Sequence, residues 1–230
     1  MTKFTIPIIS AALLLIIIFA GVFSHAQTEG FNVKTPVQTI SDNSSKFIND
    51  ISADGKRDPG ATMPIICRAE CILVIPSIQA VSGRDDFAGT GLLGCRYADS
   101  GKLAPPIFFQ ITNLESFDEN GGGLIILVMD RNGVKSILGD QLQLNPQNTA
   151  SGSGKGNEIT RSFIAYAKPA GGVIKTFDAS GGTLVYDSGD TFNAYQQDID
   201  PIDIMLFSID IPPALRGFNT SIEQLRKGCK

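Results

Sequence analysis

The feature that most constrains the fold is a six-residue apolar run, Leu124 to Met129, which follows three consecutive glycines at 121–123. The run is too short to cross a membrane, and it is the most hydrophobic segment outside the N-terminus. A short apolar run bounded by turn residues is typical of a buried strand. The sequence therefore predicts a domain whose core is a β-sheet containing residues 124–129.

Other segments have strand or helix character, and turn residues separate them. Ile72 to Pro76 is a β-branched run that ends at a proline. Thr35-Pro36 fits a helix N-cap and first position, and apolar residues then recur at near-helical spacing as far as Ile51. Further predicted strands cover 89–96, 106–111, 142–144, 162–167, 172–177, 183–186 and 203–211, with short helices at 64–69 and 130–138, a loop at 54–60, and a C-terminal helix that starts from a capping box at 220–223.

These elements predict an α+β fold: an antiparallel β-sheet domain with short helices at the N-terminal side and the C-terminus. The chain has 230 residues, of which 43% are hydrophobic, which is enough for a core of one domain. We expect a signal peptide over 1–26, a leader over 27–34 and a single domain over 35–230.

The N-terminus has the pattern of a targeting segment. Lys3 precedes an apolar stretch over 6–23, and Ser24 and Ala26 place small residues at positions −3 and −1 before Gln27. This is typical of a cleaved secretory signal. The apolar stretch is long for a signal, so an uncleaved anchor remains the alternative. Both interpretations place the body of the chain outside the cytoplasm, in the periplasm or the extracellular space.

The four cysteines, Cys67, Cys71, Cys95 and Cys229, are an even set in a chain expected to be exported, which favours disulfides over metal ligation. Three pairings are possible. Cys71 with Cys95 would close a moderate loop, and Cys229 could tie the C-terminal tail to Cys67.

The composition argues against an enzyme. Cleavage after Ala26 would remove His25, the only histidine, and with it any Ser-His-Asp, Cys-His or His-metal chemistry. The chain has no Ser-x-x-Lys or Gly-x-Ser-x-Gly motif. The glycine-rich run 151–156 is not a P-loop, which would need Gly at position 149 and Ser or Thr at position 156, where this chain has Thr149 and Gly156. A hydrolase that uses two aspartates remains open, although no pair stands out by spacing. We expect no catalytic residue, cofactor or metal.

Charge is unevenly distributed. The net charge of −4 disfavours nucleic acid as a partner. No Lys or Arg occurs between Lys175 and Arg216, a stretch that predicts a solvated acidic face. A calcium site is the alternative, although the EF-hand spacing is absent. The acidic residues of this stretch are Asp178, Asp187, Asp190, Asp198, Asp200, Asp203 and Asp210.

Several short motifs follow one another along residues 36–197. They are a helix-to-strand step at 69–77, a glycine-rich segment ending in Cys-Arg at 87–96, a proline step at 103–106, and later elements at 127–133, 166–172 and 187–195. In this order they resemble the motifs of the SYLF domain family, whose proline step reads Trp-Ser-Ala-Pro. The chain departs from the family at three places. It lacks the family's tryptophan, and the segment before the glycine-rich one, 78–86, is not rich in lysine. The family's Gly-Pro-x-Gly-Arg element is only partly kept at 151–156.

The resemblance implies a non-enzymatic lipid-binding domain that recognises phospholipid or a membrane surface. Candidate lipid contacts, chosen in or beside the family-like segments, are Arg84, Arg96, Lys102 and Lys168. The alternative is a structural or protein-interaction module of the cell envelope, with an envelope protein as its partner and no lipid ligand.

Overall fold

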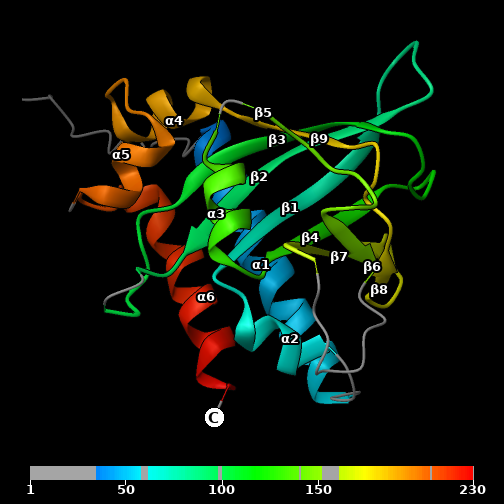
Figure 1. Ribbon diagram of the computed structural model, residues 1–230, viewed down its shortest axis with the longest axis horizontal. Coiled ribbons are helices and arrows are strands. Elements are labelled where there is room, and N and C mark those ends of the chain that lie inside the picture. Colours follow the sequence, from blue (N-terminus) through cyan, green and yellow to red (C-terminus); the bar gives the residue numbers. More distant parts are fainter. Residues whose placement is uncertain are drawn as a thin grey trace, which may run out of the picture. The chain divides into compact units, whose positions relative to one another are not determined.

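The computed structural model describes residues 35–57, 62–97, 100–139, 141–151, 161–207 and 209–229. They belong to a compact unit that runs from Lys34 to Lys230. The described residues form one large sheet with helices packed against it, which confirms the predicted α+β fold (Figure 1). The expected signal peptide and leader lie outside the described residues.

Nine strands of the described chain form the sheet, in the order β5-β9-β3-β2-β1-β4-β7-β6, with β8 paired to β7 outside this path. Neighbouring strands run antiparallel except for β6 and β7, which are parallel. The strands are β1 (Cys71–Ala80), β2 (Phe87–Cys95), β3 (Ile107–Leu114), β4 (Gly122–Val128), β5 (Gln141–Gln143), β6 (Thr149–Ser151), β7 (Phe163–Pro169), β8 (Lys175–Phe177) and β9 (Thr183–Tyr186).

Strands β1 and β4 form the centre of the core. Every residue from Cys71 to Ile75 is buried, and so is every residue from Leu124 to Val128. The prediction of a core strand at 124–129 is therefore confirmed for 124–128, which lie in β4, whereas Met129 follows the end of that strand. Strand β1 continues past Pro76, where the sequence predicted its end. Its pairing register with β4 shifts between Ile75 and Ile78, because proline cannot donate to the ladder.

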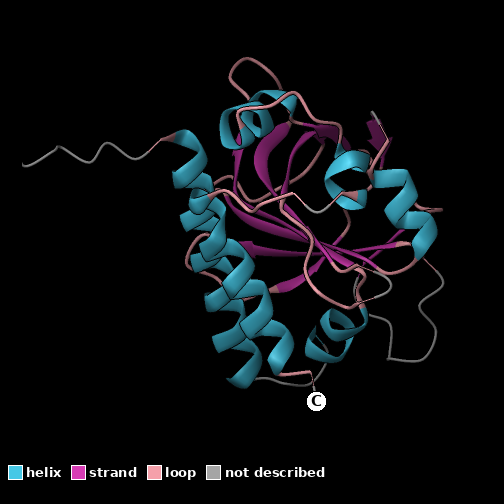
Figure 2. Cartoon of the chain, turned by 90° about the vertical axis from the view of Figure 1, so that its left-hand side faces the viewer, coloured by secondary structure: helices cyan, strands magenta, loops and turns pink. Residues whose placement is uncertain are grey.

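Two helices, α1 (Pro36–Arg57) and α6 (Arg216–Lys227), lie side by side on one face of the sheet (Figure 2). Helix α6 buries Phe218, Ile222 and Leu225, whose spacing places them on one side of a helix. None of the helices in the described part of the chain is long and apolar enough to cross a membrane. The shorter helices are α2 (Thr62–Arg68), α3 (Arg131–Ile137), α4 (Ser188–Tyr195), α5 (Pro201–Leu206) and the 3-10 helix η1 (Pro213–Leu215).

Two disulfides are formed, in one of the three pairings that the sequence left open. Cys71 and Cys95 are register partners on β1 and β2. Cys67, in α2, is bonded to Cys229, which directly follows the last turn of α6, across a sequence separation of 162. The second bond therefore ties the C-terminal helix to the start of the sheet. Structural disulfides of this kind fit an oxidising environment.

Three sequence predictions are wrong in detail. The segment 203–211 is not a strand, because helix α5 covers Pro201–Leu206. Residues 54–57 belong to α1 and not to a loop. Helix α6 begins at Arg216, so Thr220 lies inside it and donates its hydroxyl hydrogen to the Arg216 carbonyl instead of capping. In all three segments the chain forms helix where the sequence pattern indicated a strand, a loop or a helix start.

Candidate functional site

The four predicted lipid contacts do not form one group. The strand register places Arg84 and Lys168 at the end of the sheet where residues 81–86 join β1 to β2, hereafter the hairpin end. Arg96 and Lys102 lie at the opposite end, beside the Cys71–Cys95 disulfide. A single basic face made of all four is therefore not present.

Arg84 is held by its own hairpin. Its guanidinium forms an ion pair with Asp86 at 2.6 Å and donates to the side-chain oxygen of Asn113 at 2.8 Å. More than half of the Arg84 side chain is exposed. The position of the side chain is therefore fixed by Asp86 in the same connection and by Asn113 on β3, and its charge is partly compensated.

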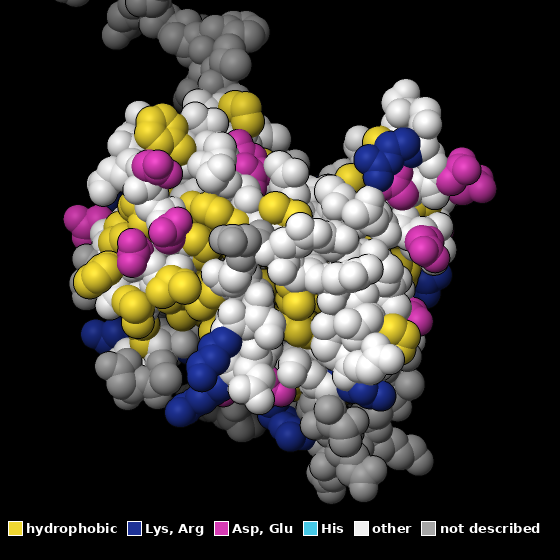
Figure 3. Space-filling model, turned by 45° about the horizontal axis from the view of Figure 1, so that its top comes forward, with side chains coloured by type: hydrophobic (Ala, Val, Ile, Leu, Met, Phe, Trp, Pro, Cys, Tyr) yellow, Lys and Arg dark blue, Asp and Glu magenta, His cyan; other side chains and the backbone are white. Residues whose placement is uncertain are grey.

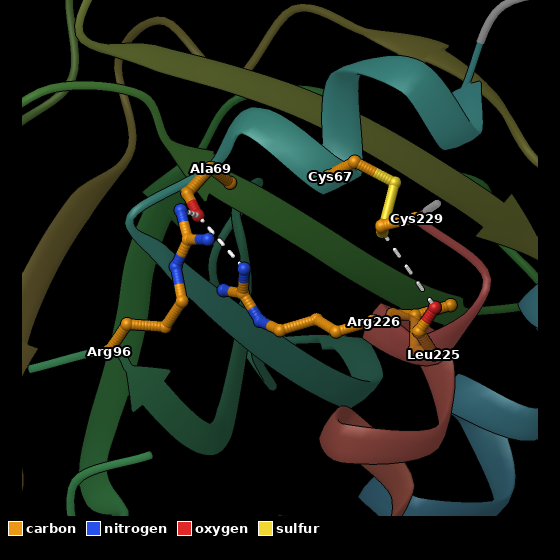
Figure 4. Close-up of a disulfide and its surroundings, with 6 residues drawn as sticks. All are labelled: Cys67, Ala69, Arg96, Leu225, Arg226 and Cys229. Carbon is orange, nitrogen blue, oxygen red and sulfur yellow. Dashed lines mark hydrogen bonds between the residues drawn. A yellow bond between two sulfur atoms is a disulfide. The ribbon is translucent and has the colours of Figure 1, made fainter. Parts of the chain in front are cut away.

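Arg96 has a structural role that the sequence did not indicate. Its Nη2 donates to the Ala69 carbonyl at 2.9 Å, and Nη1 of Arg226 donates to the same oxygen at 3.1 Å. Figure 4 shows both guanidinium groups converging on this oxygen near the Cys67–Cys229 disulfide. Burial lowers the pKa of Arg226, the positive charge of Arg96 lowers it further, and Glu70 opposes both effects. Arg226 thus connects α6, and Arg96 connects the end of β2, to the junction between α2 and β1.

Two aspartates in the family-like segments cap helices by accepting hydrogen bonds from backbone N–H groups. Asp130 accepts from Gly133 N at 2.7 Å and so caps α3. Asp187 accepts from Asp190 N at 2.9 Å and so caps α4. Within the described ranges, no group of three or more His, Cys, Asp and Glu side chains is placed to hold a metal ion.

The hairpin end offers a different combination of side chains, in the turn that joins β7 to β8. Gly172 N donates to the Pro169 carbonyl at 2.9 Å, and Gly171 has a φ of 71°, a conformation that glycine adopts readily. The turn exposes 72% of Val173 between Lys168 and Lys175. It therefore presents an apolar tip with a lysine on each side.

A first hollow, of about 250 Å³, lies on one side of this turn, and we name it the aromatic hollow. Lys175 and Asp118 line it, together with Phe117 and Phe177. The two rings stack edge to face, with their centroids 5.4 Å apart. The hollow thus combines an aromatic wall with one positive and one negative side chain.

A second hollow, of about 370 Å³, shares Pro169 with the first and contains Lys168; we name it the glycine hollow. Residues 121–123 line it with backbone atoms alone, because all three are glycines. The ring of Phe47 occupies the place that a side chain at Gly123 would take. Strand β4 and helix α1 therefore jointly shape this hollow.

Sequence reasoning found Lys168 but missed the rest of this end. A usable signal was present, since 168–175 places a Gly-Gly turn and two aliphatic residues between two lysines. The prediction treated 172–177 as strand, whereas β8 covers only Lys175–Phe177. Asp118 and Phe117 reach the hollow from the β3–β4 connection, which no local pattern reveals.

The arrangement brings together groups that can bind a charged ligand. Lysine ammonium groups bind phosphate as point charges. A carboxylate and aromatic faces attract alkylammonium groups. No known protein family matches the sequence, and no significant match to a curated protein is found.

Proposed function

We propose that this chain is an exported, non-enzymatic domain that binds phospholipid at its hairpin end. The observation that carries the proposal is the β7–β8 turn, which exposes Val173 between Lys168 and Lys175. Large apolar side chains that project from a turn lose contact with water when the turn enters a lipid interface. Lysines beside such a tip lie at the level of the headgroup phosphates.

The aromatic hollow favours a headgroup that carries both phosphate and ammonium. Lys175 can bind the phosphate, while Asp118 and the faces of Phe117 and Phe177 suit an ammonium group. A purely anionic headgroup could pair with Lys175 but would offer no cationic group to the carboxylate of Asp118. We therefore expect phosphatidylethanolamine or phosphatidylcholine to be preferred over phosphatidylglycerol.

Two independent observations support export of the chain. The two disulfides fit an oxidising compartment, and the first 26 residues have the pattern of a signal peptide. The resemblance to the SYLF family also supports lipid recognition, since Lys168, Gly171 and Gly172 lie in one of the family-like segments.

Flotation with vesicles tests this proposal. Wild-type protein should float with vesicles of phosphatidylethanolamine and phosphatidylcholine, and less with vesicles that contain only phosphatidylglycerol. Burying the Val173 side chain is worth about 2 kcal/mol, so Val173→Ser should weaken binding at least about tenfold. The double variant Lys168→Ser/Lys175→Ser should weaken it comparably.

The matched control is Lys102→Ser/Lys135→Ser, which removes two exposed lysines away from the hairpin end. Its vesicle binding should equal that of the wild type. Equal flotation of all variants, or no flotation of a folded wild type with any of the three lipids, would refute the proposal.

A further inference from the structure

A second exposed apolar surface lies on helices α4 and α5 and on the residue that follows α5. Five large apolar side chains are well exposed in the described part of the chain, and four of them belong to this region. They are Phe192 at 50%, Ile202 at 50%, Leu206 at 71% and Phe207 at 60% exposure. We name these four residues the α4–α5 surface.

The surface is continuous with the core below it. In α5, Pro201 and Ile204 are buried, while Ile202 and Leu206 point outward. A short helix that is apolar on opposite sides is usually covered on both. Half-buried Ile199, Met205, Ile209 and Ile211 pack against the core around it. Figure 3 shows apolar side chains gathered on the left of the molecule, where Figure 1 places α4 and α5.

Acidic side chains lie on the same elements and next to them in the sequence. Asp198, Asp200 and Asp210 are exposed, Asp190 and Asp203 are half-buried, and no Lys or Arg occurs between Lys175 and Arg216. Figure 3 shows acidic side chains interspersed with the apolar ones on the left. Burial and the neighbouring charge of Asp187 raise the pKa of Asp190, as expected where like charges gather.

The charge decides which occupant fits. An anionic lipid surface would face these carboxylates and be repelled. A second copy of the chain, docked through the same surface, would place aspartates against aspartates. A partner that carries apolar side chains within a basic rim satisfies both the apolar surface and the charge.

We propose that the α4–α5 surface docks a basic amphipathic helix of another protein. The apolar side of that helix would cover Phe192, Ile202, Leu206 and Phe207, and its lysines or arginines would face the aspartates. The surface lies on the opposite side of Figure 1 from the β7–β8 turn. Protein docking and lipid binding can therefore occur at separate places on one molecule.

Two synthetic peptides test this assignment. Both are helical peptides of about 18 residues with the same Leu and Phe stripe, one with a lysine rim and one with a glutamate rim. Fluorescence anisotropy should show binding of the lysine-rim peptide, with an affinity that falls as salt is added. The glutamate-rim peptide should bind at least about tenfold more weakly, since one like-charge contact already costs a factor of that order.

Variants of the chain separate the contributions. Leu206→Ser/Phe207→Ser and, separately, Asp198→Asn/Asp200→Asn should each weaken binding of the lysine-rim peptide at least about tenfold. Circular dichroism confirms that each variant is folded. Val173→Ser, which alters the fifth exposed apolar residue, is the control and should leave peptide binding unchanged while vesicle binding falls.

Several results would overturn the proposal. These are equal binding of the two peptides, no binding of the lysine-rim peptide, or an affinity that neither α4–α5 variant changes. A sedimentation shift from dimer to monomer in Leu206→Ser/Phe207→Ser would instead assign the surface to self-association. Loss of vesicle binding alone bears only on the lipid proposal.

Discussion

The contact between helix α1 and strand β4 can be tested at one pair of residues, Gly123 and Phe47. A Cβ added at Gly123 would overlap Cε2 and Cζ of Phe47 and lie 2.9 Å from Cδ2. Phe47 is only 8% exposed, so its ring has little room to move. Gly123→Ala should therefore lower the free energy of unfolding by about 2 kcal/mol, within the range of overpacked cores.

Removing the ring should reverse the sign of that effect. Phe47→Ala alone should cost about 3 kcal/mol, because it leaves a cavity. In the Phe47→Ala background the methyl group at position 123 meets no ring, and alanine is more favourable than glycine within a strand by about 0.5 kcal/mol. The double-mutant cycle should therefore show a coupling of about 2.5 kcal/mol between the two positions.

Urea unfolding followed by far-UV circular dichroism measures this cycle. Gly139→Ala is the control, since a Cβ at that exposed glycine would approach only the Ser136 carbonyl, at 3.4 Å. It should combine additively with Phe47→Ala. Additivity within about 0.5 kcal/mol for Gly123→Ala as well would refute the contact and, with it, the shape of the glycine hollow.

Three further predictions concern stability. Replacing Cys67 and Cys229 by Ser removes a cross-link over a sequence separation of 162 and should lower the unfolding free energy by up to about 5 kcal/mol in urea titrations; a loss below about 1 kcal/mol would contradict this. Burial raises the pKa of Tyr166 from 10.0 to about 12, so the folded chain retains this proton longer than the unfolded chain. Stability should therefore fall as the pH rises from about 10 to about 12, and Tyr166→Phe should reduce that fall in urea midpoints. Asp130→Ala removes the cap on Gly133 N and should cost about 1 kcal/mol, whereas Asp130→Asn should recover most of it.

The sequence was most informative where burial dominates. Residues 124–128 and 72–75 are apolar enough that only central strands of a sheet can contain them, and the structure places β4 and β1 there. Thr35-Pro36 also predicted the start of α1, because a proline at the first position of a helix loses no intrahelical hydrogen bond.

The same signal was present at Asp200-Pro201 and was outweighed by the alternating pattern of 203–211. Within this segment α5 is apolar on two sides, one facing the core and the other forming part of the α4–α5 surface. An expectation based on one buried side per element cannot anticipate a helix with a second, exposed apolar side. The misassigned element is thus also the one to which we assign a partner.

The candidate site was predictable only in part. Lys168 was selected because it lies within a family-like segment. Arg96 was selected for the same reason, but its guanidinium binds the Ala69 carbonyl. Whether an arginine contacts backbone or solvent depends on strand register and on residues far away in sequence, such as Arg226. The aromatic hollow likewise combines side chains from the β3–β4 connection and from β8.

The most direct test of the lipid proposal uses the absence of tryptophan from the chain. Val173→Trp places a single tryptophan at the tip of the β7–β8 turn, and Phe207→Trp places one on the α4–α5 surface. With vesicles of phosphatidylethanolamine and phosphatidylcholine, the emission of Val173→Trp should shift to the blue, and brominated lipid should quench it. Phe207→Trp should keep its emission maximum. A shift at position 207, or none at position 173, would contradict lipid binding through the hairpin end.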